Sequence, residues 1–290
     1  FIAARCAQAI VVMFGITAIC FVILHLTGDP AALMLPESAS QEDYRELRAR
    51  MGFDRPLPEQ FAKYMTNALQ LDFGASYHQH RPAMQVVLER VPATFELAIV
   101  AFLLALAIAL PVGIVSATHR NTALDFGAMT SALVGQSMPN FWLGLMLMMV
   151  FSLWLDLLPV SGRITYGLEK HAAYGFYLFE GLLRFDWKLF SDAARHILLP
   201  ALTAGLYSSA RLTRLVRSSM LDVLGEDYVR TARAKGLAEW KVVNVHALKN
   251  AGIPLVTLSG IELGLLLGGT VVTETVFAWP GTGILTMQAL

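Results

Sequence analysis

Long apolar runs without charge constrain this chain more than any other feature. The residues from Ala7 to Leu26 include no Asp, Glu, Lys or Arg, and about 20 apolar residues suffice to cross the hydrocarbon core of a bilayer as a helix. Only 15% of the 290 residues are charged, whereas soluble proteins carry about 25%. Backbone groups inside a bilayer must be satisfied within the segment, which favours helices. The sequence therefore predicts an all-α integral membrane protein, a multi-pass helical bundle.

Four further apolar segments follow the first. They cover residues 94–117, about 128–155, about 196–216 and about 252–277. We expect Pro111 to kink the second of the five segments, because proline removes a helical hydrogen bond. Gly135 and Pro139 interrupt the third, so its first part is expected to form a separate helical piece. The first run is longer than the core of a signal peptide, which favours a retained membrane anchor. Five spans are thus predicted.

Two polar stretches separate these segments. Residues 27–93 begin with an expected turn at Gly28-Asp29-Pro30, include an expected helix over Glu37–Phe53, and are too long for a plain loop. We therefore predict three parts: a first transmembrane segment at 1–26, a small extracytoplasmic cap at 27–93 and a core membrane domain at 94–290. The second polar stretch covers residues 156–195.

Basic residues set the expected orientation. The region from Arg211 to Asn250 holds eight Lys and Arg residues and four Asp and Glu residues. Short loops rich in Lys and Arg remain in the cytoplasm. Counting back along the spans then places both polar stretches outside, the N-terminus in the cytoplasm and Leu290 outside.

The same region predicts a pair of short helices at about 218–250, which membrane anchoring alone does not require. Asp227 is expected to cap the first helix, Gly236 to end it in a left-handed conformation, and a second helix to run from about Ala238 to Asn250. Such a basic surface between two spans suits docking of a soluble partner. The candidate docking residues are Glu226, Asp227, Arg230, Thr231, Ala232, Arg233, Ala234, Lys235, Gly236, Trp240 and His246.

A few polar residues fall inside the apolar segments. Glu262 should face protein or water, because a carboxylate is costly in lipid, whereas Glu274 is expected near the outer interface. Gly260, Gly264 and Gly268 share one helix face and permit close packing of another helix. Three arginines at a spacing of three either snorkel to the cytoplasmic face or pair with a partner: Arg211, Arg214 and Arg217. The candidates for a translocation path are Gln136, Ser208, Ser209 and Glu262.

Several chemistries find no support in the sequence. No Lys follows a Gly, which excludes a Gly-Lys-Ser/Thr phosphate loop, and no His precedes a Glu, which excludes a His-Glu-x-x-His zinc site. The spans hold no plausible nucleophile–base pair for an intramembrane hydrolase. We therefore expect no catalytic residue, no metal site and no cofactor on this chain. A net charge of zero gives no indication of a nucleic-acid partner.

Several runs carry a family resemblance. They are Ser218-Ser219-Met220, the run from Leu224 to Leu237 with Arg230-Thr231-Ala232-Arg233-Ala234-Lys235-Gly236 at its centre, His246-Ala247-Leu248, Asn250, Ile253-Pro254, Gly28-Asp29-Pro30, Pro159-Val160-Ser161-Gly162-Arg163, Thr273-Glu274-Thr275-Val276-Phe277 and Trp279-Pro280-Gly281. With these runs the chain closely resembles the permease subunits of bacterial binding-protein-dependent ABC importers, in particular the B-type permeases of dipeptide and oligopeptide importers. The wider family has Glu-Ala-Ala-x-x-x-Gly where Arg230, Thr231, Ala232 and Gly236 stand here. The docking contacts of permeases from sugar importers therefore cannot be transferred to this chain.

The resemblance implies a transport subunit of the bacterial inner membrane and not an enzyme. Its implied partners are a second homologous permease, two ATPase subunits that hold ATP and Mg, and an extracytoplasmic binding protein. Six spans are usual in this subgroup, so a sixth is expected beyond Leu290. Dipeptides or short oligopeptides are the expected cargo, with glutathione and metal chelates as alternatives. A second hypothesis is an ion-coupled secondary transporter or channel without ATPase partners, which predicts inverted repeats and several midplane carboxylates.

Overall fold

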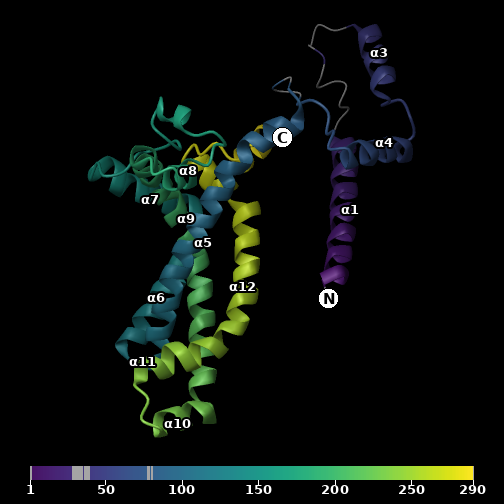
Figure 1. Cartoon of the computed structure of the whole chain (residues 1–290). Coiled ribbons are helices and arrows are strands. Elements are labelled where there is room, and N and C mark those ends of the chain that lie inside the picture. The colour runs from purple at the N-terminus through teal and green to yellow at the C-terminus, as the bar shows by residue number, and fades with distance from the viewer. Residues whose placement is uncertain (1, 28–34, 36–39, 77–78, 80, 290) are drawn as a thin grey trace. The chain divides into compact units, whose positions relative to one another are not determined.

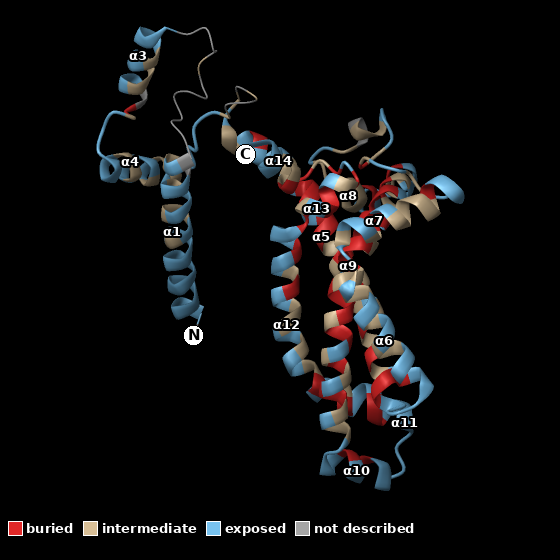
Figure 2. Ribbon diagram, turned by 180° about the vertical axis from the view of Figure 1, so that it is seen from behind, coloured by how far each residue is buried: buried red, intermediate tan, exposed pale blue. Residues whose placement is uncertain are grey.

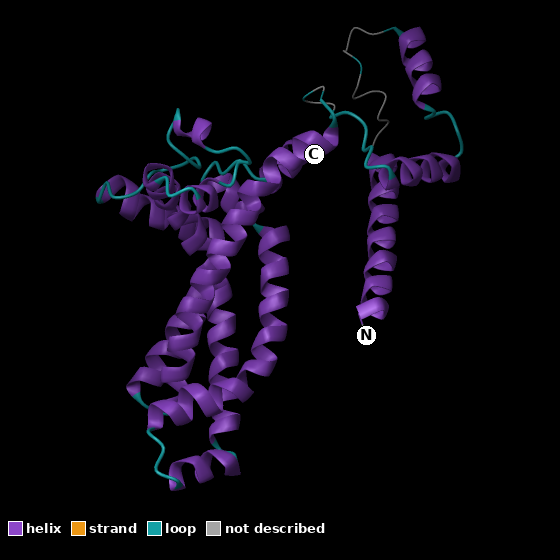
Figure 3. Cartoon of the chain, viewed as in Figure 1, coloured by secondary structure: helices purple, strands orange, loops and turns teal. Residues whose placement is uncertain are grey.

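The computed structural model describes residues 2–27, 35, 40–76, 79 and 81–289, and these residues form helices and connecting loops without a strand (Figure 3). The chain divides into two compact units, residues 1–86 and 87–290. The expected turn at Gly28-Asp29-Pro30 lies outside the described residues.

The described residues of the first unit form three helices: α1 (Ile2–Thr27), α3 (Gln41–Met51) and α4 (Leu57–Leu69). Helix α1 extends beyond the expected span at both ends and is exposed along most of its length, as a lipid-facing helix requires. Ser40 starts α3 through a capping box with Asp43, and Gly52 ends it with a φ of 81°. The described helix is therefore shorter than the expected Glu37–Phe53, because its end signals lie inside that range.

The second unit contains all but the first four residues of the long helix α5, together with the remaining elements (Figure 1). They are α5 (Ala83–Thr118), α6 (Ala123–Ser137), α7 (Asn140–Met148) with a π-helical stretch (Met149–Trp154), a 3-10 turn (Leu168–His171), α8 (Tyr177–Leu183), α9 (Trp187–Leu224), α10 (Asp227–Ala234), α11 (Glu239–Lys241) with a second π-helical stretch (Val242–Ala247), α12 (Leu248–Gly269), α13 (Val271–Val276) and α14 (Thr282–Ala289). Helices α7 and α8 lie at one end of this unit and α10 and α11 at the other, and we call these the α8 end and the α10 end.

Three helices among the described residues are long and apolar enough to cross a membrane, and a bent pair would make a fourth. The three are residues 2–23, α5, and the continuous helix from Glu239 to Gly269. The bent pair is α6 with α7 and its extension, which turn by 102° at the break. The break falls at Met138–Pro139, which confirms the expected interruption of the third segment. Helix α5 by contrast continues through Pro111 as a single helix.

Small residues bring α9 close to α5. The contact uses buried residues at every fourth position of α5, four of them alanines. Ala93, Leu97 and Ala101 share a cluster with Ala201 and Ala204 of α9, whereas Ala105 and Ala109 share one with Leu212 of α9. A Cβ added to Gly205 would lie only 2.6 Å from the backbone oxygen of Ala101. Buried residues therefore gather along α9 and at the α8 end, whereas α12 is exposed over much of its surface (Figure 2). Close backbone approach of this kind supplies packing energy where the hydrophobic effect cannot.

A buried ion pair organises the α8 end. Glu96 of α5 accepts a 2.6 Å bond from Nη2 of Arg163 and two backbone N–H bonds from Leu178 and Phe179 in the first turn of α8. The guanidinium of Arg163 also lies 4.4 Å from the ring centroid of Tyr177. One carboxylate thus joins α5, the loop before α8 and α8 itself.

Glu274, which the sequence analysis expected near the outer interface, is enclosed by protein. It is completely buried, and its carboxylate accepts bonds from the Thr94 and Thr270 hydroxyls and from the N–H of Ile284 in the first turn of α14. A carboxylate suits the N-terminus of a helix because free N–H groups point toward it. Glu274 therefore caps α14 from the preceding helix and links it to α5.

Gly205→Ala should destabilise the purified protein by about 1–3 kcal/mol, because its Cβ would meet the backbone of α5 and not a flexible side chain. The matched control is Gly264→Ala, since no atom lies within 4 Å of the added Cβ there. Thermal unfolding in detergent should show a lower midpoint for the first variant and an unchanged or higher one for the second. Equal midpoints for both variants would contradict the close packing of α5 on α9.

Glu180 of α8 predicts a dependence of stability on pH. Burial alone would raise its pKa, but N–H bonds from Ala173, Tyr174 and Phe176, together with the charge of Arg184, hold the pKa below the ordinary value of 4.5. A carboxylate with a lowered pKa stabilises the fold above its unfolded pKa and loses that contribution as pH falls through the folded pKa. Glu180→Gln should therefore lower the unfolding midpoint at pH 7, and the gap to the unmodified protein should narrow below pH 4.5. A gap that stays constant from pH 7 to pH 4 would oppose this assignment.

Candidate functional site

The candidate site is the helical turn at the α10 end, residues 226–247, which we call the elbow. Helix α9 leads into it through α10, and α11 with its π-helical extension leads out of it into α12 (Figure 1). The N-cap of α10 is Glu226 without a side-chain cap bond, so the expected cap by Asp227 is wrong. Asp227 is the first helical residue, and its carboxylate pairs with Arg230 one turn later.

Gly236 turns the chain between α10 and α11. Its φ is +75°, and its N–H bonds to the carbonyl of Arg233 at 2.9 Å. No atom lies within 4 Å of an added Cβ, so the preference for glycine comes from the backbone conformation and not from crowding. The expected left-handed helix end is confirmed.

An ion pair brackets this turn. The guanidinium of Arg233 donates from Nη2 to Oε1 of Glu239 at 2.7 Å and from Nε to Oε2 at 3.1 Å. Arginine suits this role because its planar fork matches a carboxylate in two bonds. The hydrogen bond to Glu239 also raises the pKa of Arg233, which stays cationic. The last turn of α10 is thereby tied to the first residue of α11.

One of the predicted docking residues is buried in the interior. Ala232 is buried with Val229 and Val242, and Val223 and Leu224 of α9 pack against them. The other ten candidates are exposed (Glu226, Asp227, Arg230, Thr231, Arg233, Ala234, Lys235, Gly236, Trp240, His246). Trp240 has 61% of its surface exposed. The elbow thus has an apolar underside, which fixes α10, and an exposed polar face with a tryptophan.

Two residues that the sequence analysis did not select hold α10 against α12. The side-chain amide of Asn250 donates to the Tyr228 hydroxyl at 2.7 Å, and that hydroxyl lies 3.5 Å from the carbonyl of His246. The two side chains are 22 positions apart, so no local pattern could reveal the contact.

The second docking helix does not end at Asn250. The chain stays helical from Glu239 to Gly269 and continues through Pro254. Val243, Ala247 and Ala251 are buried against Val216 and Met220 of α9 in one cluster, so packing holds the helix across the expected break. The elbow is therefore built directly onto a membrane-crossing helix.

Two of the three spaced arginines form ion pairs within the chain, which neither expectation for them included. Arg217 donates to both oxygens of Asp125, at 2.6 and 2.7 Å, and thereby ties α9 to the first turn of α6. Arg211 lies with its Nε 3.1 Å from Oε1 of Glu262 on α12. Arg214 is exposed.

The candidate path residues do not gather at one place. Ser209 lines a groove of about 520 Å³ between α5, α6, α7 and α9, and its hydroxyl donates to the Leu206 carbonyl at 2.7 Å. Ser208 is buried on α9, and Gln136 is half-buried near the end of α6. Glu262 instead lies in the contact between α9 and α12.

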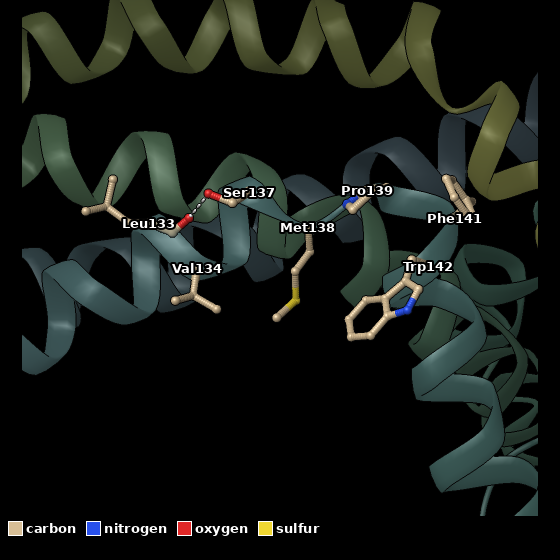
Figure 4. A pocket seen from close by; sticks show the side chains of 7 residues that line it. All are labelled: Leu133, Val134, Ser137, Met138, Pro139, Phe141 and Trp142. Carbon is tan, nitrogen blue, oxygen red and sulfur yellow. Dashed lines mark hydrogen bonds between the residues drawn. The ribbon is translucent and has the colours of Figure 1, made fainter.

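A second hollow lies at the bend between α6 and α7 and has a volume of about 520 Å³ (Figure 4). Its lining is apolar except for Ser137, whose hydroxyl bonds to the Leu133 carbonyl at 2.8 Å. Met138 lines it at the bend itself and Trp142 lines it from the first turn of α7. The hollow offers a surface to lipid or to another apolar helix and no group for charged cargo.

Comparisons with known proteins agree with the helical architecture. A family described as the binding-protein-dependent transport system inner membrane component matches residues 109–290, and the N-terminal component of the same systems matches residues 1–98. Similar proteins include the di/tripeptide transport system permease of Pseudomonas aeruginosa, 43% identical over 98% of this chain and 85% of its own length. The dipeptide transport system permease of Escherichia coli K12 is 40% identical over 100% of this chain and 87% of its own length. A probable D,D-dipeptide transport system permease of the same strain is 43% identical over 99% and 86%.

These matches extend over both described units and confirm the resemblance seen around the Arg-Thr-Ala-Arg-Ala-Lys-Gly run. They agree with the apolar helices that the structure contains. This chain therefore belongs to the family of inner-membrane components of binding-protein-dependent transport systems.

Proposed function

We propose that this chain is the permease subunit of an ATP-driven importer that moves dipeptides or short oligopeptides delivered by an extracytoplasmic binding protein. The observation that carries this proposal is the 40–43% identity, over nearly the whole chain, to permeases named for the transport of dipeptides and di- or tripeptides. An ion-coupled secondary transporter or channel is not favoured, because the matching family consists of components of binding-protein-dependent systems.

The elbow is the proposed docking site for an ATPase subunit, which would hold ATP and Mg on the partner chain. Exposed apolar side chains support this assignment, since Trp240, Tyr228 and Leu237 have 61%, 39% and 38% of their surfaces exposed. Aromatic side chains framed by charges are typical of the centres of protein interfaces. The elbow also joins α9 and α12, so a force applied to it reaches two long helices.

Membership of this family supports the remaining proposed partners. They are a second, homologous permease, a second ATPase and the binding protein. Gly260, Gly264 and Gly268 of α12 support close packing of another helix, because no described atom lies within 4 Å of a Cβ added at any of them.

We further propose five spans in this chain and a sixth after Trp279-Pro280-Gly281, with the N-terminus in the cytoplasm. Helix α9 is the span that apolar composition misses. Its 38 residues reach about 57 Å, more than the about 30 Å of a bilayer core. Its charges at Arg211 and Arg217 have carboxylate partners on neighbouring helices, which lowers the cost of inserting them.

Reconstitution of the complete complex tests the proposed function. In proteoliposomes that contain both permeases and both ATPases, uptake of a radiolabelled dipeptide should require ATP and the loaded binding protein. Uptake driven by an ion gradient without ATP would refute the proposal. Transport of another cargo class under the same ATP dependence would refute the peptide assignment alone.

The ion pair between Arg233 and Glu239, on either side of Gly236, gives a second prediction. Arg233→Glu places two carboxylates against each other, which at a solvent-exposed site opposes the native turn by about 1 kcal/mol, so uptake and stimulation of ATP hydrolysis by the binding protein should both fall several-fold. The double variant Arg233→Glu with Glu239→Arg restores opposite charges and should recover most of both activities. Full activity in the single variant, or no recovery in the double variant, would show that the Arg233–Glu239 ion pair does not position the docking surface.

A further inference from the structure

Only one of the three guanidinium nitrogens of Arg211 lies close to a carboxylate among the described residues. Its Nε faces Oε1 of Glu262 at 3.1 Å, and among the described residues its terminal nitrogens have no hydrogen-bond partner. The side chain is 32% exposed, whereas Glu262 is 1% exposed. The ring centroid of Tyr207, one turn earlier on α9, lies 5.9 Å from the guanidinium carbon. This arrangement presents the two-pronged edge of the guanidinium to whatever lies beside α9 and α12.

Lipid cannot be what this edge faces. A charged side chain in the hydrocarbon core faces protein or water, because contact with lipid chains is costly. Glu262, its partner, lies well inside the continuous helix from Glu239 to Gly269, which is apolar enough to cross the membrane. The exposed edge of Arg211 therefore opens onto a water-filled path or onto another subunit.

The ion pair with Glu262 is incomplete. Oε1 of Glu262 is buried and accepts no hydrogen bond within the described part of the chain, although Nε of Arg211 is within ion-pair distance. An off-line contact of this kind keeps the arginine charged and oriented but leaves its strongest, bidentate binding mode unused. The free edge is thus complementary in shape and charge to a second carboxylate.

We propose that Arg211 binds the carboxylate of the peptide cargo as it crosses the membrane and that Glu262 positions it. The proposal rests on the proposed function, since a peptide with a free C-terminus carries this carboxylate along with an ammonium group. The ammonium group offsets the extra negative charge that the cargo brings next to Glu262. Arg211 is the binding residue, and Glu262 acts through it.

The test compares Arg211→Gln with the double variant Arg211→Gln plus Glu262→Gln in the reconstituted complex. The single variant leaves Glu262 without its counter-charge, whereas the double variant removes both charges and leaves none uncompensated. If Arg211 binds the cargo, uptake should fall about tenfold or more in both variants. The control is Arg214→Gln, three residues along α9 and exposed, which should transport at the unmodified rate.

A second readout separates cargo binding from packing. Uptake of a dipeptide and of its C-terminal amide is measured with the binding protein saturated by each, at concentrations set from its own binding curves. The unmodified complex should prefer the free acid, and the double variant should lose that preference. Recovery of uptake in the double variant would identify the pair as a structural contact and overturn the proposal. Loss of the second permease from purified Arg211→Gln complex would assign Arg211 to the subunit interface and overturn it as well.

The proposed function and the assignment of Arg211 fail on different results. If the unmodified complex fails to import peptides at all, the proposed function fails. If it imports them and the Arg211 variants do so equally well, with the same acid-to-amide ratio, only the assignment of Arg211 fails.

Discussion

The rest of this structure depends on one constraint: charged side chains inside an apolar bundle need partners of opposite charge within reach. Insertion scales put an unpaired charge at the centre of a membrane helix at about 2.5–3.5 kcal/mol. Helix α9 meets the constraint with Arg211 against Glu262 of α12, and just beyond the expected apolar segments Arg217 pairs in the same way with Asp125 of α6. These pairs also select which helices lie beside α9. Because removing one partner leaves the other charge without its counter-charge, each pair disfavours arrangements in which α9 has a different neighbour at that position.

The two pairs and the alanine contact with α5 make α9 a single stiff arm that ends in the elbow. The second arm is the continuous helix from Glu239 to Gly269, packed on α9 through Val243, Ala247 and Ala251. The elbow therefore cannot shift without moving both arms or breaking contacts between them. Two rigid helices that share one hinge can transmit a displacement of the docking surface to distant parts of the bundle.

The sequence predicted those features whose cause is local. Gly236 ends a helix because of its own backbone conformation, and Pro139 breaks one for the same kind of reason, so both were readable. Features with distant partners were not. Glu274 takes a donor from Thr94, 180 positions away, and nothing near Glu262 in the sequence points to Arg211. The assignment of Asp227 as a cap failed because the helix begins one residue earlier than expected, with Glu226 at the N-cap and Asp227 as the first helical residue.

The ion pairs within the elbow affect how it can recognise a partner. Arg233 is matched by Glu239 and Arg230 by Asp227, so much of its charge is balanced internally. Arg230 and Asp227 are 71% and 89% exposed, so their pairing balances surface charge and adds little to stability. A partner that docks here meets paired charges around an exposed tryptophan, and specificity must then come from the shape of the elbow, which Gly236 and the Tyr228–Asn250 contact fix.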